Sequence, residues 1–212
     1  WYLTGEHNIR DHWANVIGNF DNGKLVTQPV EPGSRFSWDT YPVATSDILP
    51  HLLHEHQAGF ANLAVECSYR TRSYLNAGNG NLSREHLLIL DELADRMVRY
   101  LTFADEAEFP RDGIQVDPAY VEDFRENRRE ASNGMSLKDF DLRDRTFRLR
   151  CSYMIYSNTF QGLPDVFRRH VYRRLGEALA PGNRDTSWMP VTEKESIRTV
   201  LRETLSDLPE GW

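Results

Sequence analysis

Histidine and carboxylate side chains that could bind a metal occur close together between positions 45 and 75. His51 and Glu55 are four residues apart, so they share one face of a helix, and Glu66 falls on the same stripe. Because imidazole and carboxylate groups bind transition metals, these three residues form a candidate metal site between helices. The alternative is a hydrogen-bonded polar seam, since buried polar groups generally find partners. The run His54-Glu55-His56 does not form the HExxH zinc motif, because residues i and i+2 lie about 200° apart around a helix.

His56 lies within an apolar stripe of the same segment, together with Leu53 and Phe60. A histidine at such a position is either a core residue with a hydrogen-bond partner or the axial ligand of a haem that lies against the helix. His7, in the N-terminal region, is the candidate second haem ligand, and His12 lies nearby in the sequence. Both interpretations of His56 remain open at this point.

The two cysteines, Cys67 and Cys151, are too few for a disulfide scaffold. Their spacing excludes CxxC chemistry and covalent haem attachment through CxxCH. Each lies among apolar residues, which favours two buried free thiols; a disulfide between them is the alternative. The chain has no GxSxG elbow, Walker A loop or GxGxxG motif. No sequence motif therefore supports nucleophilic catalysis or nucleotide binding.

The elements that must position these residues are mostly helices. Apolar periodicity predicts a long helix over 45–75, capped by Ser46 or Asp47. One face of it carries small or apolar residues, Ala58, Ala61 and Val65, so we expect another element to pack there, helped by Gly59. The other predicted helices span 83–104, 118–130, 137–162, Pro164 to Pro181, and a last segment that starts at a Thr192–Glu195 capping box.

These elements predict an all-α domain over residues 45–212, an irregular bundle of five to six helices around the long central helix. Residues 1–44 are expected to form an extended arm, because their aromatic residues follow no helical period. Within the arm, Asn22-Gly23 between two apolar pairs predicts a short β-hairpin, since type I′ turns require positive φ at both central positions.

Charge and length limit the classes of function. The chain has 212 residues, 27% of them charged, and a net charge of −7, which argues against general affinity for nucleic acid. No apolar run is long enough to cross a bilayer. Arginines cluster at 125–129, 143–150 and 168–174, beside acidic residues that favour intramolecular ion pairs. Trp1 is not an initiator residue, so we expect that a signal peptide or a larger N-terminal region precedes it.

Six runs together carry a resemblance to a known family: WYLTGEHN, GNFDNGKLVTQPV, SYRTRSYL, SLKDFDLRDRTFRLRCSYMIYSNTFQGLP, RHVYRRL and DLPEGW. They resemble the C-terminal region of an uncharacterised family of bacterial exported proteins, whose members often carry a CxxCH haem-attachment segment upstream. The resemblance implies a periplasmic location and a redox neighbour. Because this chain has no CxxCH, haem c would reach it only through a region or partner outside the chain.

Three hypotheses of function follow. The first is a non-enzymatic interaction or structural module of a periplasmic protein or complex associated with a c-type cytochrome. The second is a haem- or metal-dependent redox enzyme that uses His51, Glu55, His56 and Glu66 in a site between helices. The third is a plain structural subunit of a larger assembly, in which the arm lies on a neighbouring protein. The sequence predicts a protein partner. It predicts no membrane-spanning segment.

Overall fold

The computed structural model describes residues 3, 16–30, 34, 37–40 and 46–212 of the chain. This part is mostly helical, with six α-helices and one two-stranded antiparallel sheet. The elements in chain order are β1 (Val16–Asp21), β2 (Lys24–Pro29), the 3-10 helix η1 (Trp38–Thr40), α1 (Ile48–Ala77), α2 (Arg84–Leu101), α3 (Pro118–Arg125), the 3-10 helix η2 (Tyr153–Tyr156), α4 (Asn158–Gln161), α5 (Asp165–Ala178) and α6 (Val191–Thr204). None of these helices combines the length and the apolar character needed to cross a membrane.

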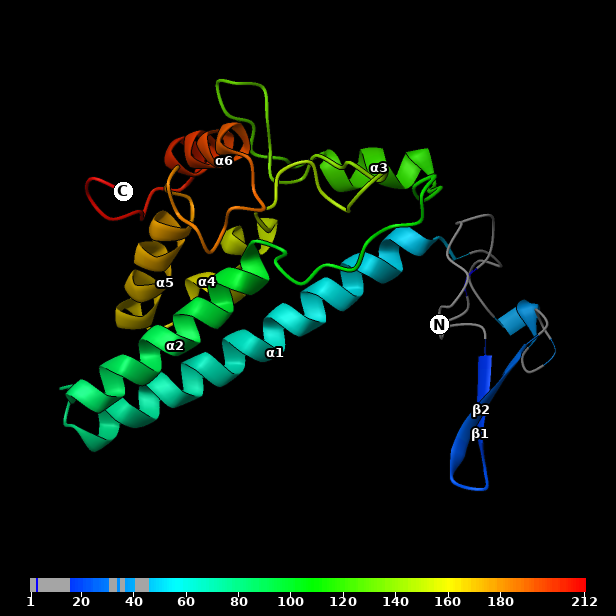
Figure 1. The fold of residues 1–212 in the computed structure, drawn as a ribbon, viewed down its shortest axis with the longest axis horizontal. Helices are drawn as coiled ribbons and strands as arrows, with labels where there is room; N and C mark the ends of the chain where they lie inside the picture. Colours follow the sequence, from blue (N-terminus) through cyan, green and yellow to red (C-terminus); the bar gives the residue numbers. More distant parts are fainter. Residues whose placement is uncertain (1–2, 4–15, 31–33, 35–36, 41–45) are drawn as a thin grey trace.

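The predicted β-hairpin is confirmed. Asn22 and Gly23 have φ values of 48° and 77°, as a type I′ turn requires, and Asp21 pairs with Lys24 across it. Phe20 stands opposite Leu25 in the register, so both side chains lie on one face of the two-stranded ribbon. Figure 1 shows the hairpin pointing away from the helices.

Helix α1 is the longest element, as predicted, and Asp47 caps it by accepting a 2.8 Å hydrogen bond from the N–H of Leu49. One face, which includes Leu53, Phe60 and Leu63, is buried in the core. The opposite face, which was expected to be covered by another element, is exposed at Ala58 and Val65. Its small residues therefore do not mark a contact within the described part of the chain.

Gly59 does allow a close approach. A Cβ atom at this position would lie 2.2 Å from the hydroxyl oxygen of Tyr100 in α2, so no other residue fits without a shift. The Tyr100 hydroxyl donates a 3.0 Å hydrogen bond to the carbonyl oxygen of His56. Glycine therefore fixes where α2 meets α1, on the flank of α1 that holds the histidine.

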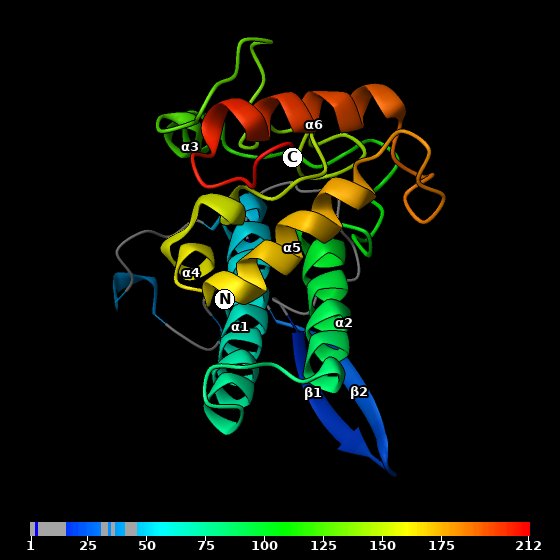
Figure 2. The same ribbon diagram turned by 90° about the vertical axis from the view of Figure 1, so that its left-hand side faces the viewer.

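Helix α5 crosses α1 and α2, and α6 runs across the end of the body (Figure 2). The α2–α5 contact is apolar at its centre and ionic at its edge. Asp91 of α2 accepts 2.5 Å hydrogen bonds from His170 and Arg173, and Asp95 pairs with Arg174. With the pairs of Arg168 to Asp165 and Asp207, the prediction of intramolecular pairs is confirmed for three of the four arginines of 168–174.

The predicted helix over 137–162 is wrong, except for the single turn α4. From Leu137 to Ser152 the chain makes turns and one isolated antiparallel bridge, between Phe140 and Phe147. The two rings are stacked with their centroids 5.2 Å apart. Phe140 and Phe147, whose spacing fits one face of a helix, therefore pack against each other across a short loop.

Aspartate side chains explain why this segment is not a helix. The Asp141 carboxylate accepts hydrogen bonds from the N–H groups of Arg143 and Asp144, at 3.0 and 2.9 Å. Asp139 accepts a 2.8 Å hydrogen bond from the N–H of Ser136, as in a capping box, but the bond closes a turn that no helix follows. Such local bonds satisfy the backbone without a helix.

Candidate functional site

His56 lies in a stack of three rings at the C-terminal end of α2. Its ring centroid is 5.2 Å from that of Tyr100, with a 14° angle between the planes, and 4.7 Å from that of Phe103, with a 25° angle. Helix α1 supplies His56 and α2 supplies Tyr100. Phe103 follows α2 with a positive φ of 54°, which turns the chain and directs this ring back onto the imidazole.

The Nε2 atom of His56 lies 2.6 Å from the hydroxyl oxygen of Ser152. Ser152 is fully buried, and its hydroxyl also accepts a 3.1 Å hydrogen bond from the N–H of Met154, which caps η2. Burial lowers the pKa of His56 to about 4, so the imidazole is neutral at neutral pH. A serine enclosed in this way holds the chain in place and is not exposed to a substrate.

The hydrogen bond between His56 and Ser152 affects whether His56 could be a haem ligand. An iron atom at Nε2 would have to displace the Ser152 hydroxyl from a buried hydrogen bond. His7, the candidate second ligand, lies outside the described residues, as does His12. The structure thus places His56 in a core-like contact and leaves haem ligation as a prediction from sequence.

A partly open cavity of about 520 Å³ lies beside the ring stack; we call it the His56 cavity. Its apolar wall comes from α1 and from the segment after α2, including Leu52, Leu63 and Phe109, and from Tyr100 and Phe103. Its polar wall holds two ion pairs, Arg96 with Glu66 at 2.6 Å and Arg99 with Asp105 at 2.5 Å, together with Asn62, Glu106 and Thr146.

The three residues of the candidate metal site are not gathered in one place. Glu66 lies eleven residues after Glu55 in the same helix, a rise of about 16 Å. Its carboxylate is held by Arg96 at 2.6 Å and Arg70 at 3.2 Å, and these partners lower its pKa. Among the residues that the structure describes, no group of three His, Cys, Asp or Glu side chains could hold a metal ion. Glu66 therefore lies on the same face as His51 and Glu55 but too far along the helix to bind the same ion.

Cys67 and Cys151 are both free and fully buried, so the disulfide alternative is wrong and the prediction of buried thiols is confirmed. Burial raises the pKa of each thiol to about 12. A thiol with such a pKa is almost entirely protonated at neutral pH, and the thiolate is the reactive form. Neither cysteine is a nucleophile in this fold.

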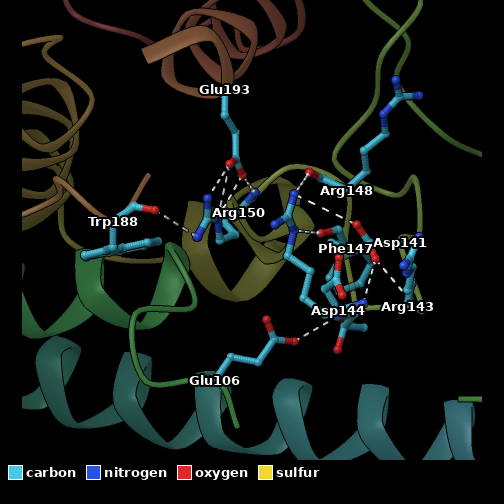
Figure 3. Close-up of polar contacts among 11 residues, drawn as sticks. Glu106, Asp141, Arg143, Asp144, Phe147, Arg148, Arg150, Trp188 and Glu193 are labelled. Carbon is cyan, nitrogen blue, oxygen red and sulfur yellow. Dashed lines mark hydrogen bonds and ion pairs between the residues drawn. The ribbon is translucent and has the colours of Figure 1, made fainter. Parts of the chain in front are cut away.

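A second polar cluster joins the loop before η2 to α6 (Figure 3). The guanidinium of Arg150 binds both carboxylate oxygens of Glu193, with the shortest contact at 2.5 Å, and the backbone N–H of Arg150 donates to the same carboxylate at 2.8 Å. The Trp188 ring covers the guanidinium at 4.8 Å. The pairing of Arg150 with Glu193 therefore fixes the loop to α6.

Sequence reasoning missed the partners of His56. Tyr100, Phe103 and Ser152 are 44, 47 and 96 residues away in the chain, and no local pattern connects them to a histidine in α1. The loop that carries Ser152 was also expected to be helical. Comparisons with known proteins add no further assignment, because no family model, curated protein or solved structure matches this chain.

Proposed function

We propose that this chain is a non-enzymatic interaction module, in which α1 is the central rod of a helical bundle and the β1–β2 hairpin is the contact arm. The observation that carries the proposal is the exposure of apolar side chains on the hairpin. Phe20 is 80% exposed, and Leu25 and Val26 are also exposed, on a ribbon that points away from the helices (Figure 1).

An isolated two-stranded hairpin is only marginally stable in water. Its outer edges also present backbone N–H and C=O groups that can pair with another chain. A neighbouring protein would cover Phe20 and Leu25 together, because both lie on one face of the ribbon. The exposed face and edges of the hairpin therefore support a role in binding a partner protein more than a catalytic role.

The polar groups around the His56 cavity support the same conclusion. Arg96, Arg99 and the imidazole of His56 are each bound by another side chain of this protein. A catalytic site needs acid, base or nucleophile groups that are accessible to substrate. Here the hydroxyl of Ser152 and both thiols are buried.

For the partner we propose a c-type cytochrome, or a haem-bearing segment linked to this chain, in the periplasm. This part rests on the sequence resemblance alone. It fits a module without a CxxCH of its own, which would meet haem c at an interface and not bind it covalently.

The test is affinity capture from periplasmic extract with three proteins: the native chain, the double variant Phe20→Ser/Leu25→Ser, and the control Leu88→Ser. Leu88 is an exposed leucine on α2, away from the hairpin. We expect a Soret band in material captured by the native chain and by the control, and its loss with the double variant. All three should unfold at the same temperature, because the changed side chains are exposed.

Two results would contradict the proposal separately. If the double variant captures the same partner as the native chain, the hairpin is not the contact arm. If the captured material has no Soret band, the cytochrome is not the partner.

The alternative, a haem- or metal-dependent redox enzyme, is favoured by one observation, the presence of His56 in the wall of a cavity between helices. It predicts a stoichiometric metal or haem in the purified native protein. Elemental analysis and a visible spectrum test it directly, and His56→Ala would then abolish the bound group.

A further inference from the structure

We propose that the His56 cavity binds an organic cation with an aromatic or apolar body, such as a protonated aromatic amine. This site lies at the α1–α2 contact and does not depend on the hairpin, so the inference goes beyond the proposed interaction function and can fail independently of it.

The size and the walls of the cavity fit such a ligand. A volume of about 520 Å³ lies within the range of small-molecule sites, which are lined mainly by apolar and aromatic side chains with a few polar groups. Leu52, Leu63 and Phe109 provide apolar surface for the body of the ligand. Tyr100 and Phe103 add aromatic surface to the lining.

The charged residues that line the cavity favour a cationic ligand over an anionic one. Three carboxylates line it, against two guanidinium groups. Glu66 is paired with Arg96 and with Arg70, and Asp105 is paired with Arg99, so among the described residues Glu106 is the carboxylate of the lining that remains outside an ion pair. Within the described residues, no Lys, Arg or His forms an ion pair with Glu106. A cationic ligand would supply the missing charge in an environment where water screens it less than in bulk.

Glu106 is held in position by one hydrogen bond, and its carboxylate can still accept others. One of its oxygens accepts a 3.0 Å hydrogen bond from the backbone N–H of Thr146, which ties the segment after α2 to the loop that carries Thr146 (Figure 3). A carboxylate has room for several donors, so the second oxygen can accept an ammonium N–H. His56, which also lines the cavity, is neutral and does not repel a cation.

Isothermal titration of the native protein with three compounds of one shape tests the proposal: tryptamine as the cation, indole-3-ethanol as the neutral form and indole-3-propionate as the anion. We expect one tryptamine to bind per chain, indole-3-ethanol to bind about fivefold more weakly, and the anion to bind least, since an exposed or half-buried charge pair contributes about 1 kcal/mol.

Two variants locate the site. Glu106→Gln keeps an acceptor for the Thr146 N–H and removes the charge, so tryptamine should bind only as well as indole-3-ethanol does. Ala107→Trp places a large ring at the exposed edge of the cavity and should abolish binding of both compounds. The control Glu122→Gln removes an equivalent exposed charge on α3 and should change nothing.

Each other outcome would overturn the proposal. Absence of saturable tryptamine binding at millimolar concentration rules out the site. Equal affinity for tryptamine and indole-3-ethanol, or a preference for the anion, rules out selection by charge. Unchanged tryptamine binding in Ala107→Trp, or an equal loss in Glu106→Gln and Glu122→Gln, places the binding elsewhere.

Discussion

The indole of Trp212 lies directly over Gly176 in α5. Its Nε1 donates a 2.6 Å hydrogen bond to the carbonyl oxygen of Tyr172, and the Arg198 guanidinium lies over the ring, 5.5 Å from its centroid. A Cβ atom at position 176 would lie 2.9 Å from Nε1. Glycine is thus required here by the close approach of a ring.

This contact predicts that the effect of Gly176→Ala on stability changes sign when the Trp212 ring is removed. Gly176→Ala alone should destabilise the protein by about 1 kcal/mol, because the indole must move away. In a Trp212→Ala background the same change should stabilise it by about 0.5 kcal/mol, the usual gain of alanine over glycine inside a helix. Urea unfolding of the four proteins measures both values, and a stabilising Gly176→Ala in the native chain would contradict the packing.

His56 predicts a loss of stability in acid. Its pKa is about 4 in the folded protein and near 6.5 when unfolded, so the unfolded chain binds more protons between these values. The contribution of neutral His56 is therefore complete above pH 6.5 and is lost as the pH falls towards 4, by at most about 3 kcal/mol.

His56→Phe should remove this contribution to the slope of the free energy of unfolding against pH, since phenylalanine keeps a ring in the stack and cannot be protonated. The measurement is the free energy of unfolding in urea between pH 4 and 7. His54→Gln, at an exposed position of the same helix, serves as the control and should keep the slope. Equal slopes in the native protein and His56→Phe would show that another group is responsible.

The Arg150–Glu193 pair predicts a strong effect of removing one partner. Glu193→Ala leaves a partly buried guanidinium and the backbone N–H of Arg150 without their acceptor, and should cost about 3 kcal/mol. Glu193→Gln keeps an acceptor and should cost about 1 kcal/mol. Glu195→Ala, an exposed change in the same helix, should stay within about 0.5 kcal/mol of the native value. Chemical denaturation measures all three.

The buried thiols predict resistance to labelling. Cys67 and Cys151 should not react with a thiol reagent under native conditions, and both should react in urea, because the reactive thiolate forms only after exposure. A surface cysteine introduced by Ser73→Cys should react at once and confirms that the reagent is active. Rapid native labelling of either buried cysteine would mean that the core opens readily.

Local signals predicted much of the fold. Asn22-Gly23 predicted the hairpin, Asp47 and Ser83 cap the helices they were expected to begin, and Pro118 starts α3. These predictions depend only on residues within a few positions of one another. Helix α6 begins one residue before Thr192, so the expected capping box there is wrong, and Pro190 occupies the N-cap position without a side-chain bond.

The segment before η2 could not be assigned from apolar spacing, because Phe140 and Phe147 are seven apart and fit two turns of a helix as well as a loop. A signal was available in the run of aspartates, since Asp141 competes for the backbone N–H groups that a helix would use. The environment of His56 had no such signal, because it depends on how this loop returns to α1.

The length of α1 has a consequence for assembly. Its 30 residues form one uninterrupted helix about 45 Å long, with the hairpin near its first turn and the tight connection to α2 at its other end. If a partner binds the hairpin as proposed, α1 holds it well clear of the α2–α5 ionic edge, and the length of the helix sets that spacing.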